Sequence, residues 1–305
     1  MITNINRKPF FSIIILSSPG RNAAIFRCLD SVMKSTSKSF EVIVVDNGST
    51  PKKEKRIRQE FPTAIYIDMK SNRGIEGFSR GFMQSTGKYI LALDDDASIL
   101  PDTLEVAHTR LRTLPKRIGV VGCNSYNPKT GQYYHEDYLK NPTRALYNQT
   151  IGGTLFKREI FSKSGYYDGK FFCWMHEDDL FIRIRNAGYF AIFDPLIKIR
   201  HFDNWSKVRK LMYYLMFRNF VWLTIKHFSL WYIPLLLIRD MMTLFFLPFK
   251  KGSLAPFFYG TAGYFVGICT ISIPLGKRKV VTPIIQKEYV NYYVLNKFAS
   301  ITIQR

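Results

Sequence analysis

The sequence predicts an α/β protein that begins with a parallel sheet, and three observations carry this prediction. Four short β-rich runs, FSIIIL, EVIVVD, AIYID and YILALD, occur within the first third of the chain. Each follows a segment of helical or turn-rich pattern, and strands that alternate with helices are typical of parallel βαβ units. The composition, 47% hydrophobic and 22% charged residues in 305, is that of a globular chain that can bury a large core.

The predicted strands follow one another along the first part of the chain. The first run, FFSIIIL, is short, lacks a small-residue cleavage site and leads into a polar turn, so we expect a buried strand and not a signal peptide. The second and fourth runs end in Asp46 and Asp94. Parallel sheets bind ligands at the carboxyl ends of their strands. We therefore expect a first domain over residues 1–204, with a nucleotide-binding half at 8–125 and an acceptor-side half at 126–204.

The remaining segment, residues 205–305, is basic and aromatic. It holds 14 Lys and Arg against two acids, an excess of 12 positive charges in a protein of net charge +21. Such an excess suits phosphate groups, either of nucleic acid or of an anionic lipid surface. No nucleic-acid-binding module is recognisable, so we expect an anionic membrane surface and no nucleic acid as partner. The four cysteines lie far apart without a CxxC pair, which predicts neither a zinc site nor a disulfide framework and fits a reducing cytosol.

Two apolar runs in this segment bear on the membrane. Residues 211–249 are rich in Leu, Phe, Met, Tyr and Trp, and residues 253–275 contain no charged side chain. The second run is long enough to span a bilayer, but its prolines and glycines make it only moderately apolar. In the first run, Arg239 and Asp240 would be costly at a bilayer centre. We expect a helical region whose amphipathic helices lie in the membrane interface, with a true span and a soluble helical core as the alternatives.

Three consecutive aspartates are the most specific feature of the sequence. The run YILALDDDASI leads an apolar strand directly into Asp94, Asp95 and Asp96. Adjacent carboxylates repel one another, so a divalent cation is the simplest partner for them. An acidic cluster at a helix N-terminus is the alternative explanation.

Two further motifs lie at the expected ligand edge. In EVIVVDNGST, Asp46 follows a strand and can accept a hydrogen bond from a nucleobase N–H, although DNGS is also an ordinary turn. In SNRGIEGFSRGF, the spacing of Gly74, Gly77 and Gly81 matches neither the Rossmann fingerprint nor a P-loop. This spacing argues against a dehydrogenase and against an NTPase.

Taken together, VVDNGS, NRG and LDDDA at these intervals resemble the inverting glycosyltransferases of family 2, which have a GT-A fold, a Rossmann-like mixed sheet flanked by helices. The resemblance implies that Asp46 binds the base of a nucleotide-sugar, that Arg73 lies near the nucleotide, and that Asp94 and Asp96, with His201, hold Mn²⁺ or Mg²⁺. The residues that it assigns to donor binding are Ser17, Asp46, Asn47, Arg73, Asp94 and Asp95.

The segment FFCWMHEDDLFIRIRNAGY resembles the acceptor-side signature of the same family. The family's catalytic base lies six residues before an arginine, and counting back from Arg183 places Glu177 at the base position and Asp179 at the second acid. His176 takes the place of the usual glutamate, so Asp178 remains an alternative base if the register is shifted by one. The residues assigned to acceptor binding are Gly153, Trp174 and His176.

The resemblance implies an inverting, metal-dependent glycosyltransferase, similar to bacterial rhamnosyl- and galactofuranosyl-type transferases of cell-envelope polysaccharides. It would move a sugar from a nucleoside-diphosphate sugar to a saccharide acceptor, either free or polyprenyl-linked, at the cytoplasmic face of the plasma membrane. Transfer to polyprenyl phosphate is the alternative reaction. A non-catalytic nucleic-acid-binding protein is a remote alternative.

Overall fold

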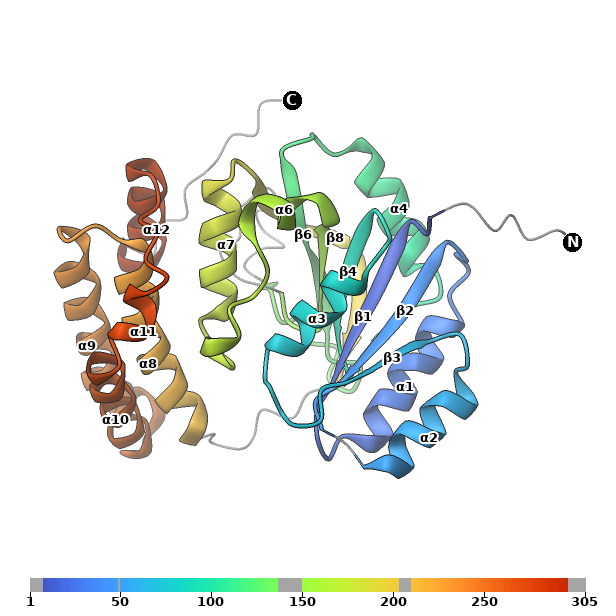
Figure 1. Cartoon of the computed structure of the whole chain (residues 1–305), viewed down its shortest axis with the longest axis horizontal. Helices are drawn as coiled ribbons and strands as arrows, with labels where there is room; N and C mark the ends of the chain where they lie inside the picture. The colour runs from blue at the N-terminus through green and yellow to red at the C-terminus, as the bar shows by residue number, and fades with distance from the viewer. Residues whose placement is uncertain (1–7, 49, 137–149, 203–209, 296–305) are drawn as a thin grey trace, which may run out of the picture.

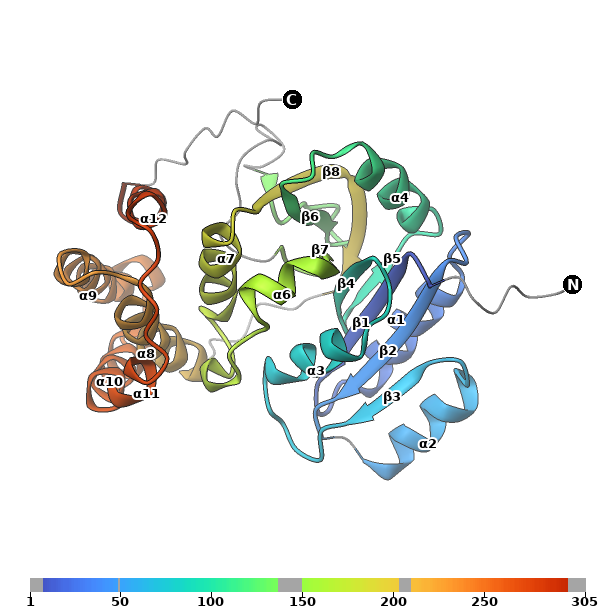
Figure 2. The ribbon, with the colours of Figure 1, turned by 45° about the horizontal axis from the view of Figure 1, so that its top comes forward.

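The computed structural model of the chain describes residues 8–48, 50–136, 150–202 and 210–295. Within these residues, eight strands form one sheet in the order β3-β2-β1-β4-β7-β6-β8-β5 (Figures 1 and 2). The strands are β1 (Phe11–Ser17), β2 (Phe40–Asp46), β3 (Ile65–Asp68), β4 (Tyr89–Asp94), β5 (Ala97–Ile99), β6 (Ile118–Tyr126), β7 (Gly153–Lys157) and β8 (Phe190–His201).

The first four strands form the parallel part of the sheet. β1 pairs in parallel with both β2 and β4, and β2 pairs in parallel with β3. β7 is antiparallel to β4 and β6, whereas β6 and β8 are parallel. The short β5 closes the other edge antiparallel to β8. The α/β fold with a mixed sheet that the sequence predicts is therefore confirmed.

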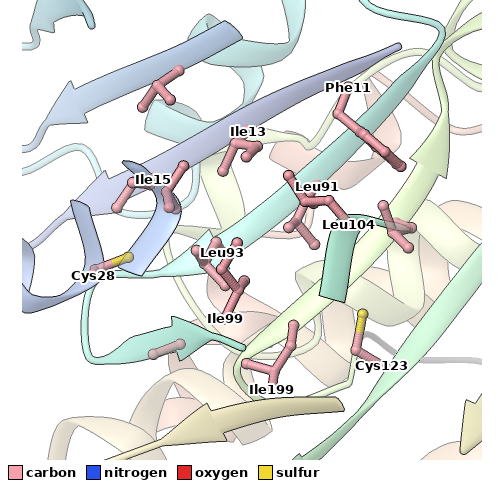
Figure 3. Close-up of a cluster of buried hydrophobic side chains, with 14 of the residues drawn as sticks. Phe11, Ile13, Ile15, Cys28, Leu91, Leu93, Ile99, Leu104, Cys123 and Ile199 are labelled. Atoms are coloured by element: carbon pink, nitrogen blue, oxygen red, sulfur yellow. The ribbon is translucent and has the colours of Figure 1, made fainter. Parts of the chain in front are cut away.

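Helices cover both faces of the sheet because the buried strands are apolar on both sides. Along β1, Ile13 packs in one core with α1 (Asn22–Met33), α2 (Pro51–Glu60) and α4 (Thr103–Thr113) (Figure 3). The next residue, Ile14, points to a second core shared with α3 (Glu76–Gln84), α6 (Phe161–Ser164) and α7 (His176–Asn186). Such continuous apolar runs are typical of strands buried on both faces. The polar ends of these strands are thereby left at one edge of the sheet.

Five further helices follow the sheet: α8 (Lys210–His227), α9 (Tyr232–Lys251), α10 (Ala255–Cys269), α11 (Ser272–Leu275) and α12 (Pro283–Leu295). They lie together beside α7, at the end of the molecule away from α1 and α2 (Figure 1). A third core joins Phe171 and Ile182 of the preceding region to Phe220 of α8 and Tyr289 of α12. Described residues from before and after the change of composition at residue 205 therefore share one hydrophobic core.

The spacing Gly263-x-x-x-Gly267 is explained by packing within the chain. A Cβ at Gly263 would lie 2.1 Å from the carbonyl oxygen of Tyr214, and one at Gly267 would lie 3.0 Å from that of Arg218. The two glycines therefore allow α10 to approach the backbone of α8.

Among the described residues, α9 is the one helix long and apolar enough to cross a membrane, over Tyr232–Phe249. Only 22% of that window is buried inside the protein. The uncharged run at 253–275 is divided between α10 and α11, which are both shorter.

Candidate active site

Strand pairing brings the predicted polar residues to one edge of the sheet. Ser17 of β1 lies opposite Asp46 of β2, and Leu16 lies opposite Asp94 of β4. The pairing of β5 with β8 sets Ala97 against His201, so His201 lies next to the segment that follows β4. These strand ends border a cleft of about 350 Å³ that is also lined by the segment preceding α7 and by its first turn.

The cleft contains a group of possible metal ligands. Carboxylate oxygens of Asp94 and Asp96 and an imidazole nitrogen of His201 lie within 4.8 Å of one another. His201 Nε2 is 3.1 Å from Asp96 Oδ1 and 3.7 Å from Asp94 Oδ2. Two carboxylates and one imidazole are a donor set that suits Mn²⁺ and similar divalent ions. The residues present therefore fit the metal that the sequence predicts.

The surroundings of the three aspartates also favour a cation. Burial raises the pKa of Asp94, and the neighbouring Asp96 carboxylate raises it further. Burial raises the pKa of Asp95 to about 6. For Asp96, His201 and Arg21 outweigh the effect of burial and lower the pKa. Three carboxylates crowded into one partly buried site repel one another, and a divalent ion between them would relieve that repulsion.

Arg21 is a residue of this cleft that the sequence reasoning missed. Its guanidinium donates to Asp95 Oδ1 at 3.1 Å and also to Asp96, while the backbone N–H of Ser18 donates to Asp95 Oδ2 at 2.7 Å. Both carboxylate oxygens of Asp95 are thus engaged by the loop after β1, and Asp95 is not part of the group of possible ligands formed by Asp94, Asp96 and His201. The sequence did contain a signal for this residue, because Arg21 lies four positions after the first strand, at the edge of the sheet where we expect ligands to bind.

The donor-side residues lie at the ends of β1 and β2. Asp46 is buried and accepts a hydrogen bond from the Tyr66 hydroxyl, and the buried Lys53 donates to the Ser17 hydroxyl. Asn47 donates to the carbonyl oxygen of Gly74 at 2.9 Å, which ties the end of β2 to the NRG loop. Neither Lys53 nor Tyr66 was predicted, since both become neighbours of Asp46 only through the fold.

Arg73 and Gly153 lie outside the lining of the cleft, as do the buried Ser17 and Asp46. The exposed Arg73 side chain borders a neighbouring hollow together with Glu76 and Arg80, and its backbone N–H donates to Asn47 Oδ1 at 3.4 Å. Gly153 begins β7 beneath the cleft, and a Cβ there would lie 2.4 Å from Ile199 Cδ1. The adjacent Gly152 makes the contact with the site, because its N–H donates to Asp94 Oδ2 at 3.1 Å.

Another part of the cleft lining comes from the start of α7. Trp174, His176 and Glu177 all line the cleft. Burial, with smaller contributions from Asp178 and Asp94, raises the pKa of Glu177 to about 8, although 26% of its side chain is open to the cleft. His176 Nδ1 lies 3.1 Å from Glu177 Oε2 without hydrogen-bond geometry, and burial lowers the pKa of His176 to about 3, so this imidazole is neutral.

The two acids that follow Glu177 point away from the cleft. Asp178 Oδ1 accepts a hydrogen bond of 2.9 Å from the Tyr289 hydroxyl of α12. Asp179 is fully buried and contacts the side chains of Arg183, Lys226 and His227. Its Oδ2 accepts from Arg183 at 2.6 Å, and its Oδ1 accepts from Lys226 at 2.7 Å and lies 2.8 Å from His227 Nε2.

The described chain therefore combines a mixed α/β sheet with a cleft at the carboxyl edge of its parallel strands, and two aspartates and a histidine lie together in that cleft. The family model described as Glycosyl transferase family 2 matches residues 13–177, which is 165 of 305 residues. The chain belongs to glycosyltransferase family 2, and its fold is of the GT-A type.

Relatives of known sequence support this assignment. An uncharacterized glycosyltransferase of Haemophilus influenzae is 28% identical over 165 residues, which is 50% of this chain and 54% of that protein. One from Rickettsia typhi is 27% identical over 209 residues, covering 64% of this chain and 65% of the relative. The chain therefore spans between about half and two thirds of the length of these relatives.

Solved structures share the fold at low sequence identity. A mannosyltransferase from Pyrobaculum calidifontis, in complex with GDP-Man and Mn²⁺, superposes with a TM-score of 0.57 at 17% identity and covers 95% of this chain and 88% of that one. GalNAc-T7 with UDP, GalNAc and Mn²⁺ gives a TM-score of 0.62 at 12% identity, covering 96% of this chain and 59% of that one.

Proposed function

We propose that this glycosyltransferase moves a sugar, with inversion, from a nucleoside-diphosphate sugar to a saccharide hydroxyl. The observation that carries the proposal is the content of one cleft. Asp94, Asp96 and His201 line it together with Glu177. Metal-assisted departure of a diphosphate and deprotonation of an acceptor require these two sets of groups in one place.

In this proposal the ligands of the divalent ion are Asp94, Asp96 and His201. Mn²⁺ or Mg²⁺ bound there would neutralise charge that develops on the leaving diphosphate. Asp46, supported by Tyr66, accepts a hydrogen bond from the base of the nucleotide, and Ser17 and Asn47 shape that end of the site. The structural neighbours solved with GDP-Man and with UDP and GalNAc support a nucleotide-sugar donor without choosing the base.

Glu177 is the residue that we propose as the base. Of the three acids at the start of α7, it is the one that lines the cleft. Asp178 is 9% exposed and bonded to Tyr289, and Asp179 is buried in its cluster with Arg183 and Lys226. A base must reach the proton that it removes, and the geometry favours Glu177 on that criterion.

The acceptor is proposed to be a saccharide rather than polyprenyl phosphate. Glu177 and Trp174 are both among the residues that line the cleft. A phosphate acceptor is already ionised and needs no base to deprotonate it. A sugar hydroxyl needs the base, and a sugar ring packs well against an aromatic face.

We further propose that the helices α9 and α10 dock on an anionic membrane, at its cytoplasmic face, and that the acceptor is lipid-linked. Both helices lie on the outer side of the helical group in two views (Figures 1 and 2). Lys251, Lys277 and Lys279 near the ends of α9 and α11 are exposed and suit anionic lipid. The exposed apolar side chains of α9 and α10 include Ile238, Met241, Met242, Phe245, Phe246, Phe249, Phe258 and Phe265.

The charged pair in the middle of α9 does not oppose this docking. Asp240 is 3% exposed and accepts a hydrogen bond of 3.0 Å from the Tyr293 hydroxyl of α12. The guanidinium carbon of Arg239 lies 4.1 Å from the centroid of the Tyr293 ring. Both side chains are engaged by α12, which leaves the apolar side of α9 to the lipid.

A thermal-shift screen tests the proposed donor chemistry. UDP-GlcNAc, GDP-Man and the corresponding free nucleotides are each added with and without Mn²⁺. Binding to the folded state raises the melting temperature, so one nucleotide class should stabilise the protein, and only when metal is present. Stabilisation by nucleotide that is equal with and without Mn²⁺ would contradict the metal assignment. Absence of stabilisation by every nucleotide-sugar would contradict the donor class.

A further inference from the structure

The segment that joins the η2 turn (Gly169–Phe171) to α7 has an unusual backbone. Phe172, Trp174 and Met175 have φ values of 64°, 66° and 57°, in the left-handed region. Residues with a Cβ are sterically disfavoured there and persist only where the surroundings fix them. Within the described part of the chain, Lys70 is the one other non-glycine residue with positive φ. The contacts that hold this segment therefore also hold the part of the cleft lining that it forms, which is Phe172, Cys173 and Trp174.

One side of the segment rests on the donor-side loop. The carbonyl oxygen of Phe172 accepts a hydrogen bond of 2.7 Å from the backbone N–H of Ile75. The two chains approach so closely that a Cβ at Gly74 would lie 2.1 Å from the same oxygen. This contact joins the NRG loop to the acceptor wall.

The other side of the segment contacts a buried amide of α8. Asn219 is 0% exposed, and its Nδ2 lies 2.9 Å from the carbonyl oxygen of Phe171 and 2.7 Å from those of Cys173 and Trp174. An Nδ2 group has two hydrogens, so three acceptors share them. The backbone carbonyls of the left-handed segment thus converge on one side chain.

The orientation of this amide is fixed by the preceding residue. Arg218 donates to Asn219 Oδ1 from Nε at 2.9 Å and from Nη2 at 2.7 Å, and Nη2 also donates to the carbonyl of Phe171 at 3.1 Å. Its guanidinium carbon lies 4.4 Å from the centroid of the Trp222 ring. Because the oxygen faces only donors and the nitrogen faces only acceptors, one amide orientation satisfies the network.

We infer that Asn219 is a positioning residue for the transfer reaction, acting through Glu177. The segment that it holds supplies Trp174 to the cleft, and Glu177 follows two residues after Met175 in the first turn of α7. Loss of the amide would let the left-handed segment relax and would move the base relative to the donor. The inference rests on the proposed role of Glu177. The experiment below distinguishes a failure of the inference from a failure of that proposed role.

The test is the rate of Mn²⁺-dependent hydrolysis of the nucleotide-sugar that stabilises the protein, UDP-GlcNAc or GDP-Man, in full-length variants. Asn219→Asp keeps the shape and replaces the donor with an acceptor. A displacement of about 1 Å at a reacting group can lower a rate about 100-fold, and we expect a fall in kcat of that order with donor KM unchanged. Asn124→Asp is the matched control, since Asn124 is also buried, and its Nδ2 makes one carbonyl contact, to Pro195 at 3.0 Å.

A double variant distinguishes positioning from general loss of structure. If Asn219 acts through Glu177, adding Asn219→Asp to Glu177→Gln should lower kcat by less than about threefold, because the base is already absent. A further fall of about 100-fold would overturn the inference, as would an unchanged kcat in folded Asn219→Asp. A near-normal rate in Glu177→Gln alone would instead overturn the proposed base.

A second variant covers the case in which Asn219→Asp does not fold. Arg218→Gln removes the donors that orient the amide, and Arg218 is only half-buried. We expect kcat to fall about tenfold with donor KM unchanged. An unchanged kcat in this variant would count against the inference.

Discussion

Replacing Asp179 with asparagine should destabilise the protein strongly, because Asp179 joins the base-bearing helix to α8. The carboxylate is fully buried and contacts Arg183 at 2.6 Å, Lys226 at 2.7 Å and His227 at 2.8 Å. Removing one member of a buried ionic cluster leaves the opposite charges uncompensated, which typically costs about 3–5 kcal/mol.

The contacts that remain in the variant place the loss near the lower end of that range. Lys226 keeps its ion pair with Asp168 at 2.8 Å. Arg183 keeps hydrogen bonds to the carbonyl oxygens of Ser164 and Tyr166. We therefore expect a loss of about 3 kcal/mol in the free energy of unfolding, which corresponds to a melting temperature lower by about 5 °C in a protein of this size.

Urea denaturation followed by circular dichroism at pH 7 measures this loss. Glu60→Gln is the control, because the exposed pair of Glu60 with Arg56, at 2.6 Å, should contribute less than about 1 kcal/mol. A loss in Asp179→Asn below about 1 kcal/mol, or equal to that of the control, would refute the reasoning.

The same pair of proteins should differ in pH dependence. Burial opposes ionisation of Asp179, but Arg183, His227 and Lys226 outweigh it and hold its pKa well below the usual range. A carboxyl group whose pKa is lowered on folding stabilises the protein above its unfolded pKa of about 4, and this stabilisation is lost as the pH falls through the folded pKa. The stability difference between wild type and variant should be constant from pH 6 to 8 and should shrink below about pH 4. A difference that grows on acidification would contradict this assignment.

Three further predictions concern the metal, the loop contact and the membrane. Asp96→Ala should abolish Mn²⁺-dependent nucleotide binding by calorimetry while the circular dichroism spectrum stays native, and retained metal-dependent binding would exclude Asp96 as a ligand. Gly74→Ala should cost about 1–3 kcal/mol in urea denaturation, because its φ is +57° and its Cβ would collide with Phe172, and an unchanged stability would show that the loop gives way. Phe246→Glu with Phe249→Glu should reduce co-flotation with phosphatidylglycerol vesicles, whereas equal flotation would place the docking surface elsewhere.

Features that depend on one short segment of the chain could be predicted from the sequence. The strands are continuous apolar runs, and Asp46 and Asp94 follow two of them directly, so their place at the carboxyl edge follows from parallel pairing. The family resemblance also identified His201 as a site residue, and β8 places its Nε2 3.1 Å from Asp96 Oδ1. These are the parts of the site that depend on local pattern and strand order.

The roles of the acids after Glu177 could not be separated in this way. Arg183 lies only four residues after Asp179, but the other partners are remote in the chain, with Lys226 lying 47 residues from Asp179 and Tyr289 lying 111 residues from Asp178. Three adjacent acids look alike in sequence, and only the packing of α8 and α12 on α7 distinguishes them. The position of Asn219 beneath a left-handed segment is likewise a consequence of that packing.

The central claim is that Glu177 removes a proton in a metal-dependent transfer from a nucleotide-sugar. The most direct measurement is single-turnover hydrolysis of the stabilising nucleotide-sugar with Mn²⁺ by wild type, Glu177→Gln and Asp178→Asn, with donor affinity measured in parallel. We predict that Glu177→Gln lowers the rate by several orders of magnitude at nearly unchanged donor affinity, and that Asp178→Asn has a mild effect. A large loss in Asp178→Asn with a near-normal rate in Glu177→Gln, or near-normal rates in both, would contradict the claim.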